Sequence, residues 1–267
     1  MSETIPSRLE PGNDATETDE RFWLEPEPDW PDGPNDFYGY ELLCVLRTPG
    51  GRFAATKSFR PDPSGLRTAV KAADYNSGWL FLCTLTFLEN LEQFFDLLKD
   101  LSTDPSAFVV RGIYFGCDAQ LKQHRVTKKT DYVVYRRGVK GHGTDGYFSE
   151  WERRLQMLDL DGVAPPDGLS VISNPEGCVN WAVDHLLPPE FANASFVYQL
   201  SSSAGLTKLD NELNVHLWFI TEQEYGDEAL RNWARWWNAK QQFKIIDPAL
   251  FTAVQPTTGV RRSFLTA

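Results

Sequence analysis

The sequence lacks long apolar segments, secretion signals and closely spaced cysteines. No segment approaches the ~20 consecutive apolar residues of a membrane-spanning helix, so none is expected. The first residues, MSETIPSRLEPG, have neither a basic nor an apolar region, which predicts a cytoplasmic protein without a secretory signal. The four cysteines form no CxxC pair, which argues against a structural zinc site. We expect Cys44, Cys83, Cys117 and Cys178 to be reduced and buried.

The acidic residues are concentrated at one end of the chain. The formal net charge is −11, but residues 1–40 contain eleven Asp and Glu against two Arg, so the remainder carries only −2. Residues 111–154 contain ten Lys and Arg against five Asp and Glu. The distribution therefore permits a nucleic-acid partner without proving one. Residues 1–36, rich in Pro, Glu and Asp, are predicted to be a flexible tail before one domain at 37–267.

Apolar patterns and turn residues predict alternating strands and helices. Expected strands are 40–48, 52–59, 79–87, 107–115, 154–160, 196–201, 213–220 and 243–246. Expected helices are 64–75, 88–101, 175–187 and 227–238. The polar, glycine-rich segment 116–150 is expected to be a mobile surface loop. The order predicts an α/β or α+β domain with an N-terminal part at 37–150 and a C-terminal part at 151–267.

The most informative local pattern is Met157-Leu158-Asp159-Leu160-Asp161-Gly162. Side chains at i and i+2 of a strand point to the same face, so Asp159 and Asp161 are predicted to lie together at the end of a buried strand. Two neighbouring carboxylates repel each other and favour a compensating cation. Oxygen ligands of this kind favour Mg²⁺ or Mn²⁺. The alternative is that both residues only form a turn before Gly162.

Two further patterns follow along the chain. The segment Ser201-Ser202-Ser203-Ala204-Gly205 could hold phosphate through hydroxyl and amide groups, and His216 on a later strand could donate to a phosphate oxygen. Asp247 ends an apolar strand. Each pattern alone is also typical of ordinary structure: His216 of a core residue, Asp247 of a turn.

Taken in order, these patterns resemble the archaeo-eukaryotic primase superfamily, in particular the primase-polymerase domains of bacterial phages, plasmids and integrative elements. The resemblance covers about residues 80–264. It rests on four stretches in the right order, FVVRG at 108–112, WERRLQMLDLDG at 151–162, SSSAG with VHLWF at 201–219, and IDPALF with Val254-Gln255. The chain departs from the family where Asn214 replaces the usual Ser before Val215-His216, and where Pro256 follows Gln255 in place of a His-Tyr pair.

The resemblance implies an archaeo-eukaryotic primase fold, in which an RRM-like antiparallel catalytic sheet is joined to a smaller αβ unit. It implies a DNA primase or polymerase that transfers nucleotides from (d)NTPs by a two-metal mechanism, with Asp159, Asp161 and Asp247 holding two Mg²⁺ or Mn²⁺ ions. Residues implied to bind the incoming nucleotide are Ser201, Ser202, Ser203, Lys208, His216 and Arg261.

The expected partners are a single-stranded DNA template, nucleoside triphosphates and a helicase domain or protein. Residues predicted to contact the template are Arg111, Arg136, Arg137 and Lys140. A solvated loop is the alternative for this basic segment.

Two other functions remain open at this stage. The motif DLDGV at 159–163 is also similar to the first motif of haloacid-dehalogenase-type phosphatases, where Asp159 would be the nucleophile and Asp161 the general acid and base. That motif normally opens its fold, whereas here it lies past the middle of the chain. A catalytically inactive domain that binds a replication partner is the other alternative.

Overall fold

The computed structural model describes residues 41–49, 58–61, 69–73, 80–114, 131–136, 147–201, 203–204, 211–256 and 263–266. The predicted tail at 1–36 lies outside them. Residues 39–267 form one unit. Its described residues contain two four-stranded antiparallel sheets, two strand pairs and three α-helices. This mixed architecture agrees with the predicted α/β or α+β class.

The first sheet has the order β5-β1-β4-β7. Its strands are β1 (Glu41–Arg47), β4 (Leu80–Leu88), β5 (Ala107–Val110) and β7 (Asp131–Tyr135). The two strand pairs are β2 (Ser58–Pro61) with β3 (Ala69–Ala73) and β6 (Ile113–Tyr114) with β8 (Phe148–Ser149). Alternate residues of β1 enter two different hydrophobic clusters, so both faces of this strand are buried.

The second sheet has the order β12-β10-β11-β9. Its strands are β9 (Arg153–Val163), β10 (Phe196–Leu200), β11 (Leu213–Tyr225) and β12 (Ser263–Thr266). An isolated antiparallel bridge between Leu160 and Ile246 adds a short segment on the outer side of β9. Across this sheet the order is therefore the 246 segment, β9, β11, β10 and β12.

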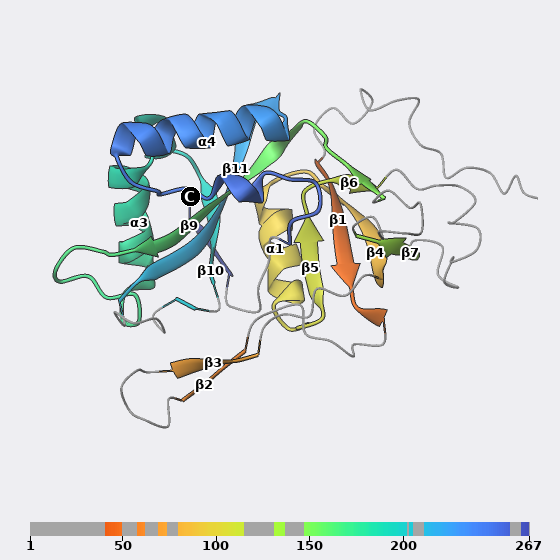
Figure 1. Cartoon of the computed structure of the whole chain (residues 1–267), viewed down its shortest axis with the longest axis horizontal. Coiled ribbons are helices and arrows are strands. Elements are labelled where there is room, and N and C mark those ends of the chain that lie inside the picture. The colour runs from red at the N-terminus through yellow and green to blue at the C-terminus, as the bar shows by residue number, and fades with distance from the viewer. Residues whose placement is uncertain are drawn as a thin grey trace, which may run out of the picture. The chain divides into compact units, whose positions relative to one another are not determined.

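Three helices cover the second sheet (Figure 1). The helices α3 (Pro175–Leu186) and α4 (Asp227–Gln241) pack on one face, where Leu158, Leu160 and Val215 join their apolar side chains in one cluster. The helix α1 (Leu91–Leu101) packs on the other face and also contacts the first sheet through a second cluster. Two 3₁₀ turns, η4 (Pro189–Phe191) and η5 (Pro248–Leu250), complete the described elements.

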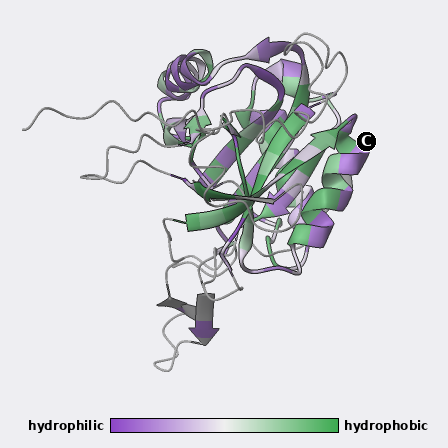
Figure 2. Cartoon of the chain, turned by 90° about the vertical axis from the view of Figure 1, so that its right-hand side faces the viewer, coloured by the Kyte–Doolittle hydropathy of each residue, from purple (hydrophilic) through white to green (hydrophobic). Residues whose placement is uncertain are grey.

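The sequence explains helix α1 directly. Asn90 caps its first turn by accepting a hydrogen bond from the Gln93 amide at 2.9 Å. Phe94, Leu98 and Leu101 recur at helical spacing and are buried. Phe94 packs against Trp218 of β11 with ring centroids 4.6 Å apart. Figure 2 shows mostly hydrophobic strands in the sheets and helices that alternate between hydrophobic and hydrophilic residues.

Several predicted elements differ from the structure. The helix predicted at 64–75 is wrong, because Ala69–Ala73 form strand β3 against β2; strand pairing outweighs the helix propensity of three Ala and one Lys there. The loop predicted at 116–150 contains β7 and β8. The final strand predicted at 243–246 is reduced to the single bridge at Ile246.

Other predictions concern burial and membrane contact. Cys44, Cys83 and Cys178 are buried thiols outside any disulfide of the described residues, as predicted, and Cys117 lies outside the described residues. None of the helices in the described ranges has the length and apolar character that a bilayer crossing requires.

Candidate functional site

The site begins where strand β9 leaves the apolar core. Leu158 and Leu160 face helices α3 and α4, so Asp159 points to the opposite face of the sheet. On that face Asp159 lies opposite His216 of β11. The His216 Nε2 atom is 3.6 Å from Asp159 Oδ1, and the two side chains are 15% and 23% exposed. The structure thus brings together two residues predicted from separate motifs.

A β-bulge interrupts the pairing of β9 with β11 beside this pair. The register between β9 and β11 shifts between Leu213 and Val215, which places Asp161 and Gly162 in an irregular part of the ladder. Gly162 has φ of +72°, a conformation that glycine adopts without steric strain. The Asn214 Oδ1 atom accepts a hydrogen bond from the Gly162 amide at 2.6 Å. Asn214 therefore fixes the turn that carries Asp161.

The third carboxylate reaches the same end of β9 from the opposite direction. The Asp247 amide donates to the Asp159 carbonyl oxygen at 3.1 Å, next to the bridge between Leu160 and Ile246. Asn238 of α4 holds this segment: its Oδ1 accepts from the Ile245 and Ile246 amides at 2.9 and 3.0 Å. Its Nδ2 donates to the Ile246 carbonyl oxygen at 2.8 Å.

Charges converge on Asp159 at this position. Burial raises the pKa of the Asp159 carboxyl, and repulsion from Asp161 and Asp247 raises it further. His216 and Lys244 oppose this rise. The Lys244 Nζ atom lies 3.2 Å from Asp247 Oδ1. Three carboxylates thus interact electrostatically at one sheet end, and His216 and Lys244 offset the rise in the pKa of Asp159 only in part.

The donor types suit a hard divalent cation, because carboxylate oxygens are its preferred ligands. Within the described ranges, however, no group of three His, Cys, Asp or Glu side chains is arranged to hold a metal ion. The carboxylates are gathered by the backbone, but their side chains do not form a finished coordination shell.

The predicted serine turn follows β10 at the same end of the sheet. The Ser201 amide donates to the Asn214 carbonyl oxygen at 2.8 Å. The Ser201 and Ser203 hydroxyl oxygens are 3.0 Å apart, and His216 lies opposite Gln199 of β10. The serines therefore lie on the strand next to His216. Ser202, Lys208 and Arg261 lie outside the described residues.

Two predicted template contacts lie in the interior instead. Arg111 forms a buried ion pair with Asp227 and donates to Gln156 Oε1 at 2.7 Å and the Tyr225 carbonyl oxygen at 2.9 Å. Arg136 is 3% exposed and donates to the Val254 carbonyl oxygen at 3.3 Å. These positions do not fit template contact. Arg137 and Lys140 lie outside the described residues.

Three residues of the site were not predicted as functional. Asn214 was noted only as a departure from the resembled family, although an Asn at that position can hold the neighbouring turn. Asn238 is the last residue of the helix predicted at 227–238, and no local signal in the sequence indicates its hydrogen bonds to residues 245 and 246. Lys244 lies three residues before Asp247, a spacing that allows an ion pair.

Comparison with known proteins adds no relative. No protein-family model matches this chain, and neither the curated proteins nor the solved structures contain a significant match.

Proposed function

We propose that this protein is a template-directed nucleotidyltransferase of the primase-polymerase type. The observation that carries the proposal is the hydrogen bond of 3.1 Å from the Asp247 amide to the Asp159 carbonyl oxygen. It joins two motifs separated by most of the C-terminal half of the chain. Through it, Asp247 approaches an Asp-x-Asp strand that already faces His216.

The order of elements supports the same proposal. The chain runs β9-α3-β10-β11-α4 and then the 246 segment. In space the 246 segment lies next to β9, then come β11 and β10, all antiparallel. This is the βαββαβ arrangement of split-βαβ folds, as expected for an RRM-like sheet. In this proposal the first sheet, with α1 between it and the second sheet, would be the smaller αβ unit that the resemblance implies.

Asp159, Asp161 and Asp247 are the residues that would hold two Mg²⁺ or Mn²⁺ ions. When bound, such ions supply activation of the attacking hydroxyl and stabilisation of charge on the leaving group. The protein's own contribution is positioning. Asn238 and the Leu160–Ile246 bridge orient Asp247, and Asn214 orients the Asp161 turn. The repulsion among the carboxylates favours cation binding, because each bound positive charge relieves it.

The neighbouring residues are suited to the nucleotide's phosphates. The His216 Nε2 atom, which lies 3.6 Å from Asp159 Oδ1, is the ring nitrogen that could donate to a phosphate oxygen, because Nδ1 is buried. Ser201 and Ser203 hydroxyls lie on the adjacent strand end. Phosphoryl transfer needs mainly orientation and charge stabilisation from a protein. The row of carboxylate, histidine and serine across three neighbouring strands offers both.

The experiment that tests the proposal is primer extension on a single-stranded DNA template with Mg²⁺ or Mn²⁺. We expect metal-dependent extension by the wild type and a loss of at least ~100-fold in Asp159→Ala/Asp161→Ala, because charge stabilisation at the transition state is typically worth that much. Asp167→Asn is the matched control, since Asp167 is an exposed carboxylate six residues beyond Asp161. The control should retain wild-type activity.

A phosphate-ester hydrolysis assay is carried out in parallel with primer extension. Hydrolysis without extension would replace the proposal by the phosphatase, in which Asp159 acts as a nucleophile. The phosphatase mechanism needs only Asp159 and Asp161. The approach of Asp247 and His216 to Asp159 therefore gives that alternative no added support. Silence in both assays would favour a binding domain without activity.

A further inference from the structure

The exposed end of helix α4 combines aromatic rings with positive charge. Trp236 and Phe243 are 58% and 54% exposed, which makes them the two most exposed aromatic residues of the described ranges. Lys240 lies between them in the sequence, and its Nζ atom is 5.4 Å from the ring centroid of Trp236 and 5.0 Å from that of Trp237. This cation–π contact keeps a positive charge beside an exposed ring.

This part of the chain is basic although the protein as a whole is acidic. Residues 229–246 contain two Arg and two Lys but no Asp or Glu, in a chain with a formal net charge of −11. Two of these four side chains are paired with a carboxylate. The other two, Arg235 and Lys240, are exposed and form no ion pair with any described residue. The end of α4 therefore attracts a polyanion.

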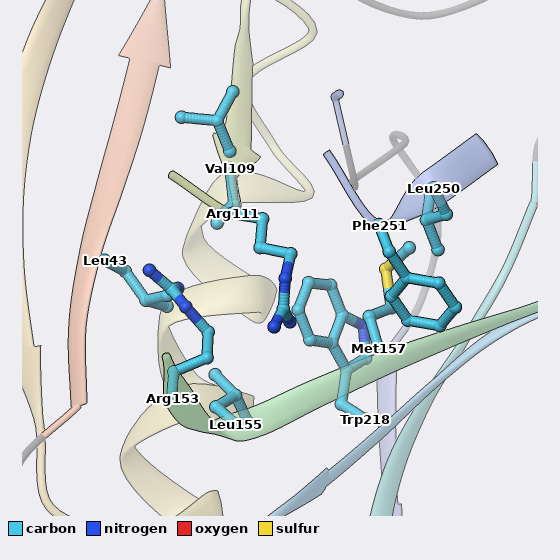
Figure 3. Close-up of a pocket in the computed structure, with 10 residues that line it drawn as sticks. Leu43, Val109, Arg111, Arg153, Leu155, Met157, Trp218, Leu250 and Phe251 are labelled. Atoms are coloured by element: carbon cyan, nitrogen blue, oxygen red, sulfur yellow. The ribbon is translucent and has the colours of Figure 1, made fainter. Parts of the chain in front are cut away.

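Two other arginines are enclosed and do not serve an external polyanion. Arg111 and Arg153 extend into a small space between the two sheets, among residues such as Leu155 and Trp218 (Figure 3). They are 7% and 3% exposed. A strand on the outside of the protein cannot contact them.

The chemistry of the α4 end fits single-stranded nucleic acid. Unpaired bases stack on exposed aromatic rings while the phosphates contact Lys and Arg. Duplex DNA keeps its bases stacked on one another and offers none to the rings. A membrane fits less well, because the apolar face of α4, with Leu230, Ala234 and Trp237, is packed in the core and cannot insert. A second copy of the chain would bring like charges together.

This end of α4 does not belong to the catalytic face. The helix packs on the face of the sheet to which Leu158 and Leu160 point, whereas Asp159 points to the opposite face. The chain connects the two regions through Lys244, whose Nζ atom is 3.2 Å from Asp247 Oδ1. A strand bound at the end of α4 would therefore make contacts in addition to those at the carboxylates.

We propose that the last two turns of α4 and the residues just after it bind single-stranded DNA. In this proposal bases stack on Trp236 and Phe243, and Arg235 and Lys240 contact phosphates. The choice of DNA over RNA rests on the proposed function, whereas the binding of an unpaired strand rests on these side chains alone.

Fluorescence anisotropy of labelled oligo-dT, without metal ions or nucleotides, tests the proposal. We expect Trp236→Ala and Phe243→Ala each to weaken binding roughly tenfold, because each removes a stacking ring. Trp236→Phe keeps a ring and should bind within about threefold of wild type. Lys240→Gln should weaken binding and lower the slope of log affinity against log salt by about 0.7. Phe87→Ala, at a residue of β4 that is 46% exposed, is the matched control and should bind like wild type.

Three other probes separate the possible partners. An abasic strand of equal length keeps the phosphates but lacks bases, so it should bind roughly tenfold more weakly than oligo-dT. Oligo-rU should bind no more tightly than oligo-dT, and phosphatidylglycerol vesicles should not bind. The proposal is overturned if the wild type does not bind oligo-dT, if Trp236→Ala binds it as tightly as wild type, or if the abasic strand binds equally well. Tighter binding of oligo-rU, or vesicle binding that Trp236→Ala abolishes, would also overturn it.

The two proposals fail separately in these assays. Strand binding that depends on Trp236 without any primer extension would reject the proposed function alone. Metal-dependent extension with equal strand affinity in Trp236→Ala and wild type would reject the α4 contact alone.

Discussion

Asp159 is a residue whose ionised form lowers the stability of the folded protein. Its carboxyl is largely buried and faces two other carboxylates, and both effects raise its pKa above the usual 3.8. The folded state therefore binds this proton more tightly than the unfolded chain does, and stability is lost as the pH rises and the carboxyl ionises. Such a residue is kept at the expense of the free energy of folding, as is typical of functional sites.

Replacing Asp159 by Asn removes this penalty. Because Asn cannot ionise, we expect Asp159→Asn to raise the Tm at pH 7 by roughly 2–4 °C. The difference from wild type should vanish near pH 3, where the wild-type carboxyl is protonated in both states, and grow as the pH rises above about 3.8. Differential scanning calorimetry across pH measures it. A variant less stable than wild type at pH 7 would contradict the raised pKa.

The Arg111–Asp227 pair has the opposite role. Both side chains are buried, at 7% and 0% exposure, so removing one charge leaves the other uncompensated. We expect Asp227→Asn to lower the free energy of unfolding by about 3–5 kcal/mol, measured by urea denaturation. Asp104→Asn, which breaks the partly exposed Arg47–Asp104 pair of 3.3 Å, should cost under about 1 kcal/mol. Similar losses in both variants would argue against a buried pair.

At the scale of elements, helix α4 controls the short segment that carries Asp247. Asn238 makes three hydrogen bonds to residues 245 and 246, whereas the segment pairs with β9 through a single bridge. The helix side chain therefore supplies most of the hydrogen bonds that would otherwise come from a full strand. Lost hydrogen bonds here should displace Asp247 without unfolding the sheet.

We expect Asn238→Ala to reduce metal-dependent extension by roughly 10–100-fold, the usual effect of removing a group that orients a metal ligand. The required Mn²⁺ concentration should rise, while far-UV circular dichroism stays near wild type. Asn238→Asp keeps the two acceptors and should retain more activity than Ala. Asn232→Ala, exposed on the same helix, is the control. Equal Mn²⁺ dependence in Asn238→Ala and wild type would show that Asp247 does not depend on this contact.

At the scale of the whole molecule, charge is divided between the first residues and the rest. Residues 1–36 carry all eleven acidic residues of the N-terminal stretch, and without them the net charge falls from −11 to −2. If the protein binds DNA, deleting them should tighten binding to a labelled single strand by roughly three- to tenfold at low salt, and much less at high salt. Fluorescence anisotropy at two salt concentrations measures this. Unchanged affinity at low salt would exclude a shielding role for the tail.

Regular patterns predicted five elements of the C-terminal half well but missed β12 and overextended the strand at 243–246, and they predicted the N-terminal half less well. The elements around β9, α3, β10, β11 and α4 were expected within a few residues, because their apolar periods are long and their ends carry turn residues. β3 was mistaken for a helix, since five residues of AVKAA have no decisive period and only pairing with β2 fixes them.

The residues of the candidate site were likewise predicted where local periodicity determines their position and missed where long-range contacts do. Asp159 and Asp161 could be placed on one face from strand period alone, but the contact between Asp159 and Asp247 depends on long-range pairing. Arg111 and Arg136 were expected at the surface because charge is usually solvated. Their burial follows from partners that are distant in sequence, namely Asp227 and the Val254 carbonyl group.

The late position of Asp247 also has a consequence for synthesis. A ribosome that adds ~5–20 residues per second makes Asp159 and Asp161 roughly 4–18 seconds before Asp247. During that interval the nascent chain lacks the partner that pairs with the outer edge of β9. A growing polypeptide can therefore expose the acidic pair but cannot yet complete the carboxylate set, so any activity that needs all three begins only after residue 247 has been translated.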